Sequence, residues 1–497
     1  MRNKAPTALV ILDGFGYRAQ DSYNGIAQAH TPTLNWLMGN YPVTLLKASG
    51  TSVGLPEGWI GNSEVGHLTI GCGKAIAQSA SIIGDAIEKG TFFTHPTLLK
   101  NLQTLKEHNR TLHLIGLVSD AGVHAHSDHM IAFLKAARAQ GLSDIVIHAI
   151  TDGRDTTPRS AIQFLEKITD ALNLYGGGIL GSIMGRFYGM DRNRNWNLTA
   201  QAYNCLTQQQ KTIPESWQSH LKTSYEHTIS DEFIVPTQLH HNAIIKPHDG
   251  VIFCNYRPDR ARQLTACFTQ TPSPLKKPTL PLSFFMTPVS YGEHFKTTAL
   301  FEKSQVPRTL SQILHDKKYS IFYVAETEKY AHITYFFNGG REEAFPAEKR
   351  VLVPSLTPKE FVTHPRMSAD TITEVIVDSL RYDMYDFYVI NYANADMVGH
   401  TGNFKATVSA VECLDEQLKI LHKEIVEERE GTLYITSDHG KAEEMFDTTT
   451  KQPKTSHTAN PVPFIVAKKS LYQKDTELPL SELADIAPFI IKNFKIV

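Results

Sequence analysis

Short apolar runs rich in β-branched residues alternate along this chain with polar turns and with stretches in which apolar residues recur every three or four positions. The first pattern predicts buried strands, and the second predicts amphipathic helices. Their alternation is typical of an α/β protein with largely parallel sheets. The clearest strand and turn segments, several followed by a helical pattern, span residues 7–16, 112–141, 144–168, 178–186, 250–264, 386–400 and 432–440.

The loops that follow these predicted strands are of two chemical kinds. Loops near the two ends of the chain carry aspartate and histidine, whereas loops in the middle carry arginine. Ligands of open parallel sheets bind at the carboxyl ends of the strands, so we expect two separate binding edges. A chain of 497 residues is also too long for one core. The sequence therefore predicts a discontinuous metal-binding domain, residues 1–77 and 305–497, and an inserted substrate-binding domain, residues 78–304.

A single serine, Ser63, stands in the glycine-flanked turn of the segment GWIGNSEVGHLTIGCG, residues 58–73. Serine is a favoured helix N-cap, and Gly61-Asn62 is a turn, so a cap is one interpretation. The other is a nucleophile whose hydroxyl is exposed on a tight turn. Because helix caps are far commoner than nucleophiles, this segment by itself favours the cap.

The loops near the chain ends offer six candidate metal ligands. If NADMVGHTG is helical, Asp396 and His400 lie one turn apart and face the same way. Each candidate alone is weak, because an aspartate at a strand end is more often a helix cap and a lone histidine is more often structural. Together they form a mixed oxygen and nitrogen set, which suits manganese, zinc or cobalt better than calcium. The candidates are Asp13, Asp396, His400, Asp438, His439 and His457.

Two such ions side by side form the kind of site that handles phosphoryl groups. This would give Ser63 a purpose, because a hydroxyl bound to a metal ion loses its proton readily. The convergent ligand set therefore favours the interpretation of Ser63 as a nucleophile.

The middle loops offer guanidinium groups just after apolar strands, where pockets form. Planar guanidinium binds phosphate and carboxylate in bidentate fashion, so a substrate with both groups would account for many arginines. The alternative is a solvated basic face with surface ion pairs. The segment VHAHSDH also admits a metal site, but no second cluster nearby completes one. The candidate substrate contacts are His124, Arg154, Asp155, Arg186, Arg192, Arg257, Arg260, Arg262 and, in AETEKYAH, Lys329.

Composition limits the function classes. The net charge of −2 and the lack of a basic tract interleaved with aromatic residues argue against nucleic acid as a partner. The five cysteines form no C-x-x-C pair, which argues against a disulfide framework and favours a reducing compartment. No apolar run approaches the length of a signal peptide or a membrane span. We therefore expect a cytoplasmic enzyme with a small-molecule substrate and without a membrane or nucleic-acid partner.

Specific motifs run nearly from end to end of the chain: LDGFG, GNSEVGH, TDGRDT, GRFYGMDR, NYRPDRARQL, AETEKYAH, FFNGG, NADMVGHTG, SDHG and SHTANPVPF. In these motifs the chain resembles the cofactor-independent phosphoglycerate mutases, glycolytic isomerases of the alkaline phosphatase superfamily. The resemblance implies an alkaline-phosphatase-like metal domain with an inserted α/β transferase domain. It also implies interconversion of 3-phosphoglycerate and 2-phosphoglycerate through a phosphoserine, with two divalent metal ions and without 2,3-bisphosphoglycerate.

The resemblance assigns roles to the candidate residues. It implies Ser63 as the nucleophile, and we expect Asp155 to exchange protons with the substrate oxygens. One metal ion is implied on Asp396, His400 and His457, and a second on Asp13, Ser63, Asp438 and His439. The implied substrate contacts are His124, Arg154, Asp155, Arg186, Arg192, Arg257, Arg260 and Lys329. The chain departs from the usual family pattern at Lys74, Lys441 and Arg194, none of which replaces a residue named above.

We expect manganese as the ion, with cobalt or zinc as alternatives, and a monomeric enzyme. Two rival enzymes share the metal half, namely a plain phosphomonoesterase and a mutase of another sugar phosphate, and the middle arginines argue against both. A third rival is a non-catalytic phosphate-binding or metal-binding protein. The serine beside a full ligand set argues against it, because binding alone needs no nucleophile.

Overall fold

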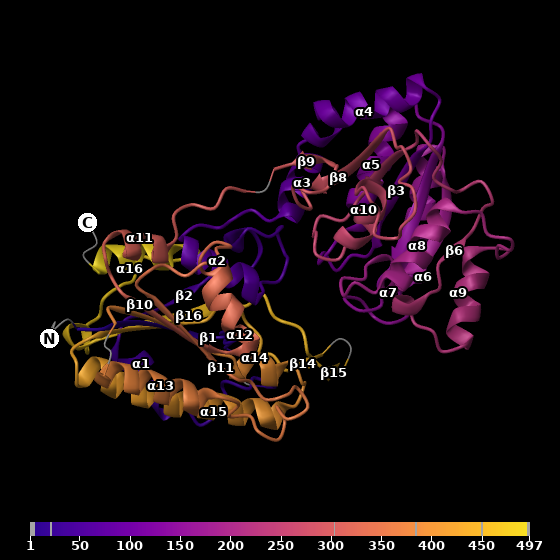
Figure 1. Ribbon diagram of the computed structural model, residues 1–497. Coiled ribbons are helices and arrows are strands. Elements are labelled where there is room, and N and C mark those ends of the chain that lie inside the picture. The colour runs from indigo at the N-terminus through magenta and orange to yellow at the C-terminus, as the bar shows by residue number, and fades with distance from the viewer. Residues whose placement is uncertain (1–4, 20–21, 303, 383–384, 449–450, 495–497) are drawn as a thin grey trace. The chain divides into compact units, whose positions relative to one another are not determined.

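The computed structural model describes residues 5–19, 22–302, 304–382, 385–448 and 451–494. The chain divides into two compact units, whose elements are labelled in Figure 1. Residues 1–77 and 305–497 form one unit, which we call the outer unit, and residues 78–304 form the other, which we call the middle unit. Each unit contains its own seven-stranded sheet.

The sheet of the outer unit has the strand order β11-β10-β12-β1-β13-β16-β2. The first five of these strands run parallel, and β16 is antiparallel to both of its neighbours. The central strands β1 and β12 are buried along their whole length, as expected for parallel strands covered on both faces. The bounds are β1 Thr7–Leu12, β2 Val43–Leu46, β10 Ile321–Glu326, β11 Glu348–Val353, β12 Phe387–Tyr392, β13 Thr432–Thr436 and β16 Val462–Lys468.

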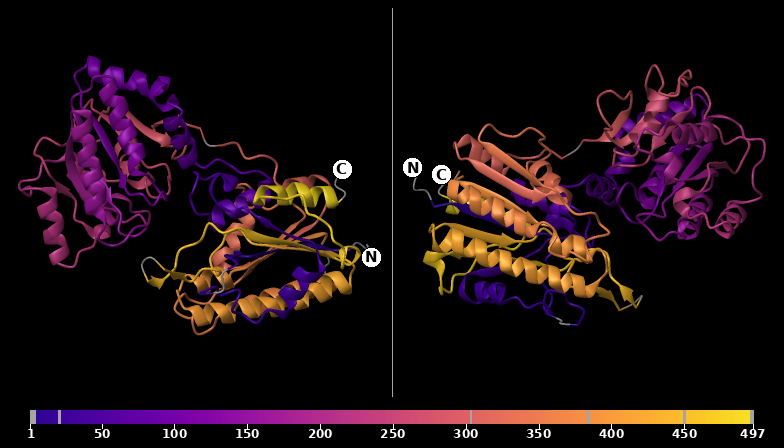
Figure 2. Two further views of the ribbon diagram at one scale, coloured as in Figure 1. Left: turned by 180° about the vertical axis from the view of Figure 1, so that it is seen from behind. Right: turned by 60° about the horizontal axis from the view of Figure 1, so that its bottom comes forward.

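Helices cover both faces of this sheet, because alternate residues of a strand point to opposite sides. Ala8 and Val10 of β1 belong to one apolar core together with α1, α13 and α15, whereas Leu9 and Ile11 belong to a second core with α2, α11 and α16. Figure 2 shows the long orange helices α13 and α15 lying along one face. The helices of this unit are α1 Pro32–Asn40, α2 Ser63–Cys72, α11 Leu310–Asp316, α12 Thr327–Ala331, α13 Ala369–Tyr382, α14 Asn394–Gly399, α15 Phe404–Leu421 and α16 Ile486–Asn493.

The sheet of the middle unit has the order β6-β5-β4-β3-β7-β8-β9, and only β6 is antiparallel to its neighbour. The expected α/β fold with largely parallel sheets is therefore confirmed. The strands are β3 Leu112–Val118, β4 Ile145–Thr151, β5 Ile179–Gly185, β6 Thr237–Gln238, β7 Gly250–Phe253, β8 Phe284–Val289 and β9 Thr298–Phe301. The helices are α3 Ser79–Glu88, α4 Pro96–Glu107, α5 Ser127–Ala139, α6 Ala161–Tyr175, α7 Arg186–Gly189, α8 Trp196–Thr207, α9 Trp217–Glu226 and α10 Arg262–Thr269.

Strand order decides which loops meet at the carboxyl edge of each sheet. In the outer unit β12, β1 and β13 are neighbours, and Asp396, Asp13 and Asp438 follow them within a few residues. In the middle unit β5, β4, β3 and β7 are consecutive, and the loops after them carry the candidate arginines and His124. Each unit therefore gathers side chains of one chemical kind at one edge.

Candidate active site

Ser63 is the first residue of α2, but it does not cap that helix. The N-cap is Asn62, whose side chain accepts a hydrogen bond from the backbone N–H of Val65. The interpretation of Ser63 as an N-cap is therefore wrong. Its buried hydroxyl instead lies 3.0 Å from Nε2 of His439 and 3.2 Å from Oδ1 of Asp13. The serine thus points into the cluster of predicted ligands.

The ammonium group of Lys329 lies within the same cluster. Its Nζ is 2.6 Å from Oδ1 of Asp13, 2.7 Å from Oδ2 of Asp396 and 2.8 Å from Oγ of Ser63. Burial lowers the pKa of this lysine, but the attraction of Asp13 and Asp396 outweighs burial and raises it, so the group is charged. Sequence reasoning grouped Lys329 with the arginines of the middle loops. The structure places it in the outer unit, within hydrogen-bonding distance of the serine.

Three predicted ligands of the first metal ion converge on one point. Nε2 of His400 and Nε2 of His457 are 2.9 Å apart, and Oδ1 of Asp396 lies 3.1 and 3.3 Å from them. Each imidazole faces a backbone carbonyl through Nδ1, at 2.6 Å for His400 and 3.0 Å for His457. A carbonyl only accepts hydrogen bonds, so in the neutral rings Nδ1 carries the proton and Nε2 carries a lone pair.

This arrangement fits a cation. Two lone pairs and a carboxylate oxygen that face one another repel unless a positive charge lies between them. Oδ1 of Asp396 is buried and has no hydrogen-bond donor among the described residues. The carbonyls that hold Nδ1 of each ring are the outer partners that metal-bound histidines usually have. The donor set of Asp396, His400 and His457 is therefore suited to a divalent ion.

The predicted ligands of the second ion are also close together. Nε2 of His439 lies 3.6 Å from Oδ1 of Asp13 and 3.4 Å from Oδ2 of Asp438. Burial and the neighbouring Asp438 carboxylate raise the pKa of Asp13 to about 6. Burial lowers the pKa of His439 to about 3, against the opposing effect of the Asp438 carboxylate, and the His457 ring lowers it further. The imidazole of His439 is therefore neutral. Carboxylates crowded around a neutral imidazole again match the chemistry of a cation site.

In the middle unit, Arg186 is buried between two carboxylates. Its Nη1 is 2.6 Å from Oδ1 of Asp152 and 2.5 Å from Oδ2 of Asp155. Asp155, the predicted proton-exchanging group, is thereby held on a fixed guanidinium at the carboxyl end of β4. Asp152 also accepts the backbone N–H groups of Arg154 and Asp155, which shapes this loop.

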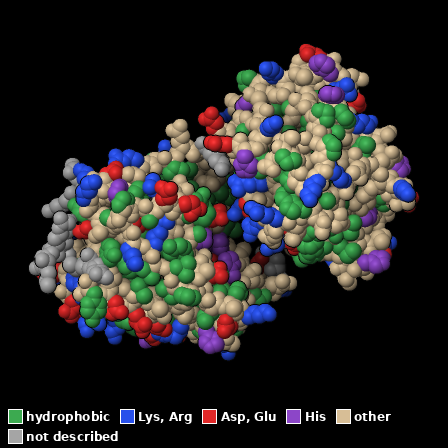
Figure 3. All heavy atoms as spheres, in the orientation of Figure 1, with side chains coloured by type: hydrophobic (Ala, Val, Ile, Leu, Met, Phe, Trp, Pro, Cys, Tyr) green, Lys and Arg blue, Asp and Glu red, His purple; other side chains and the backbone are tan. Residues whose placement is uncertain are grey.

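Five of the predicted arginines gather on this edge, including Arg257, whose Nε lies 3.4 Å from Oδ1 of Asp259. Burial, together with the positive charges of Arg186, Arg192 and Arg154, lowers the pKa of Arg260. Arg154 and Arg192 are each about half exposed, at 55% and 51%, and remain accessible to an anion. Figure 3 shows Lys and Arg side chains gathered on part of the middle unit's surface. Arg262 differs, because its Nε donates to the carbonyl of Tyr291 at 2.9 Å in a structural contact.

Comparison with known proteins agrees with this geometry. The profile described as Metalloenzyme superfamily matches residues 5–497. A protein of Synechococcus elongatus named 2,3-bisphosphoglycerate-independent phosphoglycerate mutase is 43% identical over 98% of this chain and 92% of its own length. The chain belongs to this mutase family. A mutase of the same name from Coxiella burnetii, strain Dugway 5J108-111, is 42% identical over 99% of this chain and 95% of its own length.

A solved structure supports the same family. The structure of Leishmania mexicana phosphoglycerate mutase at low cobalt concentration aligns with a TM-score of 0.74 and 29% identity. The alignment covers 98% of this chain and 95% of that chain. The likeness therefore extends over both units of this mutase-family chain.

Sequence reasoning missed two residues that position the outer cluster. Asn391 in β12 donates from Nδ2 to Oδ2 of Asp13 at 2.8 Å and lies 3.0 Å from Nε2 of His67. Glu443 is buried and accepts hydrogen bonds from three different loops, among them one from the backbone N–H of Gly16 at 3.1 Å. The signal for Asn391 was a polar residue inside an apolar strand, and the signal for Glu443 was a carboxylate soon after SDHG.

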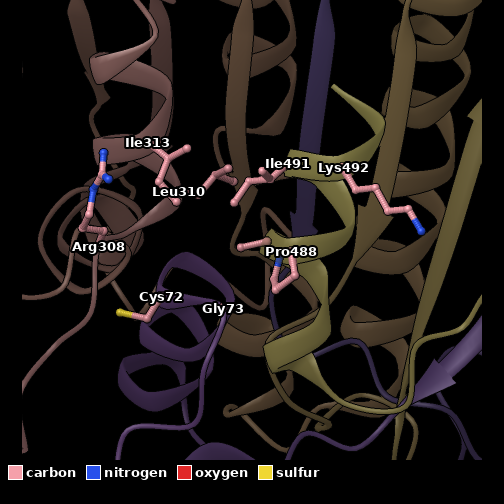
Figure 4. A pocket seen from close by; sticks show the side chains of 9 residues that line it. Cys72, Gly73, Arg308, Leu310, Ile313, Pro488, Ile491 and Lys492 are labelled. Carbon is pink, nitrogen blue, oxygen red and sulfur yellow. The ribbon is translucent and has the colours of Figure 1, made fainter. Parts of the chain in front are cut away.

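A pocket of about 440 Å³ lies at the opposite end of α2 from Ser63 and is distinct from this cluster. Figure 4 shows Leu310 and Ile491 turned toward each other across it. It is lined by Cys72, Gly73, Arg308, Leu310, Ile313, Ala487, Pro488, Ile491 and Lys492, which offer no carboxylate or imidazole.

Across the described residues of the chain, no helix combines the length and apolarity required to cross a membrane.

Proposed function

We propose that this protein interconverts 3-phosphoglycerate and 2-phosphoglycerate without 2,3-bisphosphoglycerate. The observation that carries the proposal is the hydroxyl of Ser63, set among Asp13, Lys329 and His439 at one sheet edge. Membership of the mutase family and the arginine-rich edge of the middle unit support it. We propose the same roles for the remaining residues as the family resemblance implies.

Ser63 is the group that accepts the phosphoryl group in this proposal. The hydroxyl of Ser63 gives its proton to Oδ1 of Asp13, which lies 3.2 Å away. Its Oγ then attacks phosphorus, the bond from phosphorus to O3 of the glycerate breaks, and Asp155 gives O3 a proton. In the second half, Asp155 takes the proton from the O2 hydroxyl, O2 attacks the phosphoserine, and the bond from phosphorus to Oγ breaks. Asp155 thus regains its proton, and Asp13 returns the other proton to Oγ of Ser63, so the enzyme ends as it began.

The charge of Lys329 favours this chemistry. Its ammonium group lies 2.8 Å from Oγ of Ser63 and stabilises negative charge on that oxygen and on an arriving phosphate. Two divalent ions, for which we propose manganese, would be held by the two ligand sets described above. When bound, they supply Lewis-acid stabilisation of the oxygens around phosphorus.

The arginines of the middle unit are proposed to hold the substrate's anionic groups. Arg186 holds Asp155 in place, whereas the half-exposed Arg154 and Arg192 are free to exchange their carboxylate partners for substrate. This edge separates a mutase from a phosphomonoesterase, because glycerate must be retained while phosphate is on the serine. We further propose a monomer that works in the cytoplasm; the described cysteines are all buried and free, which suits a reducing compartment.

The test is to incubate manganese-loaded protein with 3-phosphoglycerate and no bisphosphoglycerate, and to measure 2-phosphoglycerate and free phosphate. We expect 2-phosphoglycerate as the main product and phosphate on Ser63 by mass spectrometry. Ser63→Ala should lose turnover by several orders of magnitude. Ser52→Ala is the matched control, because Ser52 is equally buried but donates to the carbonyl of Ser49. Free phosphate as the only product would establish a phosphatase and refute the proposal.

A further inference from the structure

His124 is rigidly placed at the carboxyl edge of the middle unit, beside β7. It is only 4% exposed, and its carbonyl accepts the backbone N–H groups of Tyr256 at 2.9 Å and Arg257 at 3.2 Å. These bonds fix the histidine to the loop that follows β7. The position of its ring is therefore set by the fold, whereas the position of its proton is set by the groups that face the two ring nitrogens.

One of those groups is a carboxylate that neither the motif analysis nor the proposed mechanism uses. Nδ1 of His124 and Oδ1 of Asp259 are buried, have no hydrogen-bond partner among the described residues, and lie 3.5 Å apart. The other oxygen of Asp259 accepts from Nη1 of Arg192 at 3.0 Å. Nε of Arg257 lies 3.4 Å from Oδ1, which retains a second lone pair for the imidazole.

The opposite ring nitrogen faces the predicted proton-exchanging group. Nε2 of His124 lies 3.9 Å from Oδ2 of Asp155, and that oxygen already binds Arg186 at 2.5 Å. Because Oδ2 accepts from Arg186, it acts as an acceptor and not as a donor toward Nε2. The space next to Nε2 is therefore bounded by Asp155 and by the arginines that are proposed to hold substrate.

The imidazole is neutral in these surroundings. Burial and the positive charges of Arg186 and Arg257 lower the pKa of His124 to about 4, against the opposing effect of Asp259 and Asp155. For Asp259, burial raises the pKa, but the positive charges of Arg257 and Arg192 outweigh burial and lower it, so the carboxylate is ionised. A neutral imidazole has one N–H, so the choice of nitrogen decides what the ring can bind.

We propose that Asp259 is a positioning residue that keeps the proton of His124 on Nδ1, so that Nε2 presents a lone pair to the free hydroxyl of the substrate. This inference rests on the proposed function and deepens it. Carboxylate and ionised phosphate oxygens only accept hydrogen bonds, and in a phosphoglycerate the free hydroxyl is the donor. An Nε2 lone pair therefore attracts the hydroxyl and repels phosphate.

The consequence is an orientation for the substrate. The free hydroxyl donates its one proton to Nε2 of His124, which lies 3.9 Å from Oδ2 of Asp155, so the hydroxyl is held within reach of the group that later takes this proton. The phosphate is directed away from this position, toward other groups. The alternative is that Asp259 only pairs with Arg192 and Arg257 and leaves the histidine proton unspecified.

The test is nitrogen NMR of protein with ¹⁵N-labelled histidine and diamagnetic zinc, with His124→Gln used to assign the signals of His124. We expect a single neutral tautomer with the proton on Nδ1. In Asp259→Leu we expect the proton to redistribute toward Nε2. Glu232→Leu is the matched control, because Glu232 pairs with Arg154 at 3.3 Å and should leave the His124 signals unchanged. A wild-type proton on Nε2, or unchanged signals in Asp259→Leu, would overturn the inference.

Kinetics provide a second measurement. Loss of one oriented hydrogen bond in Asp259→Leu should lower kcat about tenfold, whereas Glu232→Leu should act mainly on KM. A change in KM alone for Asp259→Leu would assign it only to arginine pairing and overturn the proposal. The NMR result does not depend on turnover. A wild-type enzyme with the expected tautomer but without mutase activity would refute the proposed function and leave the role of Asp259 standing.

Discussion

Replacing the buried Glu443 by glutamine should damage the outer cluster without touching any predicted ligand. Oε2 of Glu443 accepts the backbone N–H groups of Gly16 at 3.1 Å and Lys441 at 2.8 Å. Oε1 accepts from Oγ1 of Thr458 and from Nδ2 of Asn460. These partners flank Asp13, His439 and His457 along the chain, so one carboxylate connects the three loops that carry them.

The size of the effect follows from the four donors. A glutamine keeps one accepting oxygen, which must face the two backbone N–H groups because these cannot rotate. Its amide nitrogen then meets Thr458 and Asn460, which must turn to accept. Hydrogen bonds to a charged group contribute about 1.5–3 kcal/mol and neutral ones about 0.5–1.5 kcal/mol, so four weakened bonds should lower the free energy of unfolding by about 2–4 kcal/mol. Because these hydrogen bonds hold the loops that carry the predicted metal ligands, their loss should also weaken metal binding about 10- to 100-fold.

The assay is denaturant unfolding together with manganese affinity by calorimetry. The neighbouring Glu444→Gln is the matched control, because Glu444 is 26% exposed and pairs with Lys454 at 2.9 Å on the surface. A surface pair of this kind contributes about 0–1 kcal/mol, so this variant should resemble wild type. Equal effects of the two variants on stability and on metal affinity would refute the view that Glu443 joins the three loops.

Three further outcomes are expected. His457→Ala should lower metal content by about one ion per chain, measured by mass spectrometry, whereas the exposed His364→Ala should leave it unchanged. Arg192→Ala should raise the ratio of free phosphate to 2-phosphoglycerate, because glycerate escapes about 10- to 100-fold faster; a proportional fall of both rates would contradict this. Burial lowers the pKa of His113 in the middle unit, against the opposing effect of Asp249, and burial together with the neighbouring His113 ring lowers the pKa of His148. Only their unfolded forms take up protons just below pH 6.5, so the free energy of unfolding should fall with decreasing pH by up to about 1.4 kcal/mol per unit for each histidine. A flat profile between pH 7.5 and 5 in denaturant unfolding would show that the folded imidazoles titrate normally.

The sequence by itself predicted the elements and the chemistry of their loops. The apolar run of β1 is buried along its whole length and is followed directly by Asp13, as its pattern indicated. The segment NADMVGHTG is helical where expected, so Asp396 and His400 face each other at 3.1 Å. Patterns of this kind are readable because burial and helical periodicity act over a few neighbouring residues.

Finer local features were less predictable. The helix that follows the turn at residues 58–62 was expected, but the cap is Asn62 and not Ser63. Both residue types are good caps, and a shift of one position costs little in local free energy. The choice depends on the tertiary contacts of Ser63, whose hydroxyl is already engaged with His439 and Lys329.

Only the tertiary structure decided which distant residues meet. The order β10-β12-β1-β13 places Lys329, Asp396, Asp13 and Asp438 at one edge, although they are widely separated along the chain. Strand order is set by the crossover helices and by packing of both sheet faces, which no local pattern records. The roles of Glu443 and Asp259 were hidden for the same reason. An acidic residue in a polar loop has the same local sequence pattern whatever its role. Its function depends on the hydrogen-bond donors that folding brings to it.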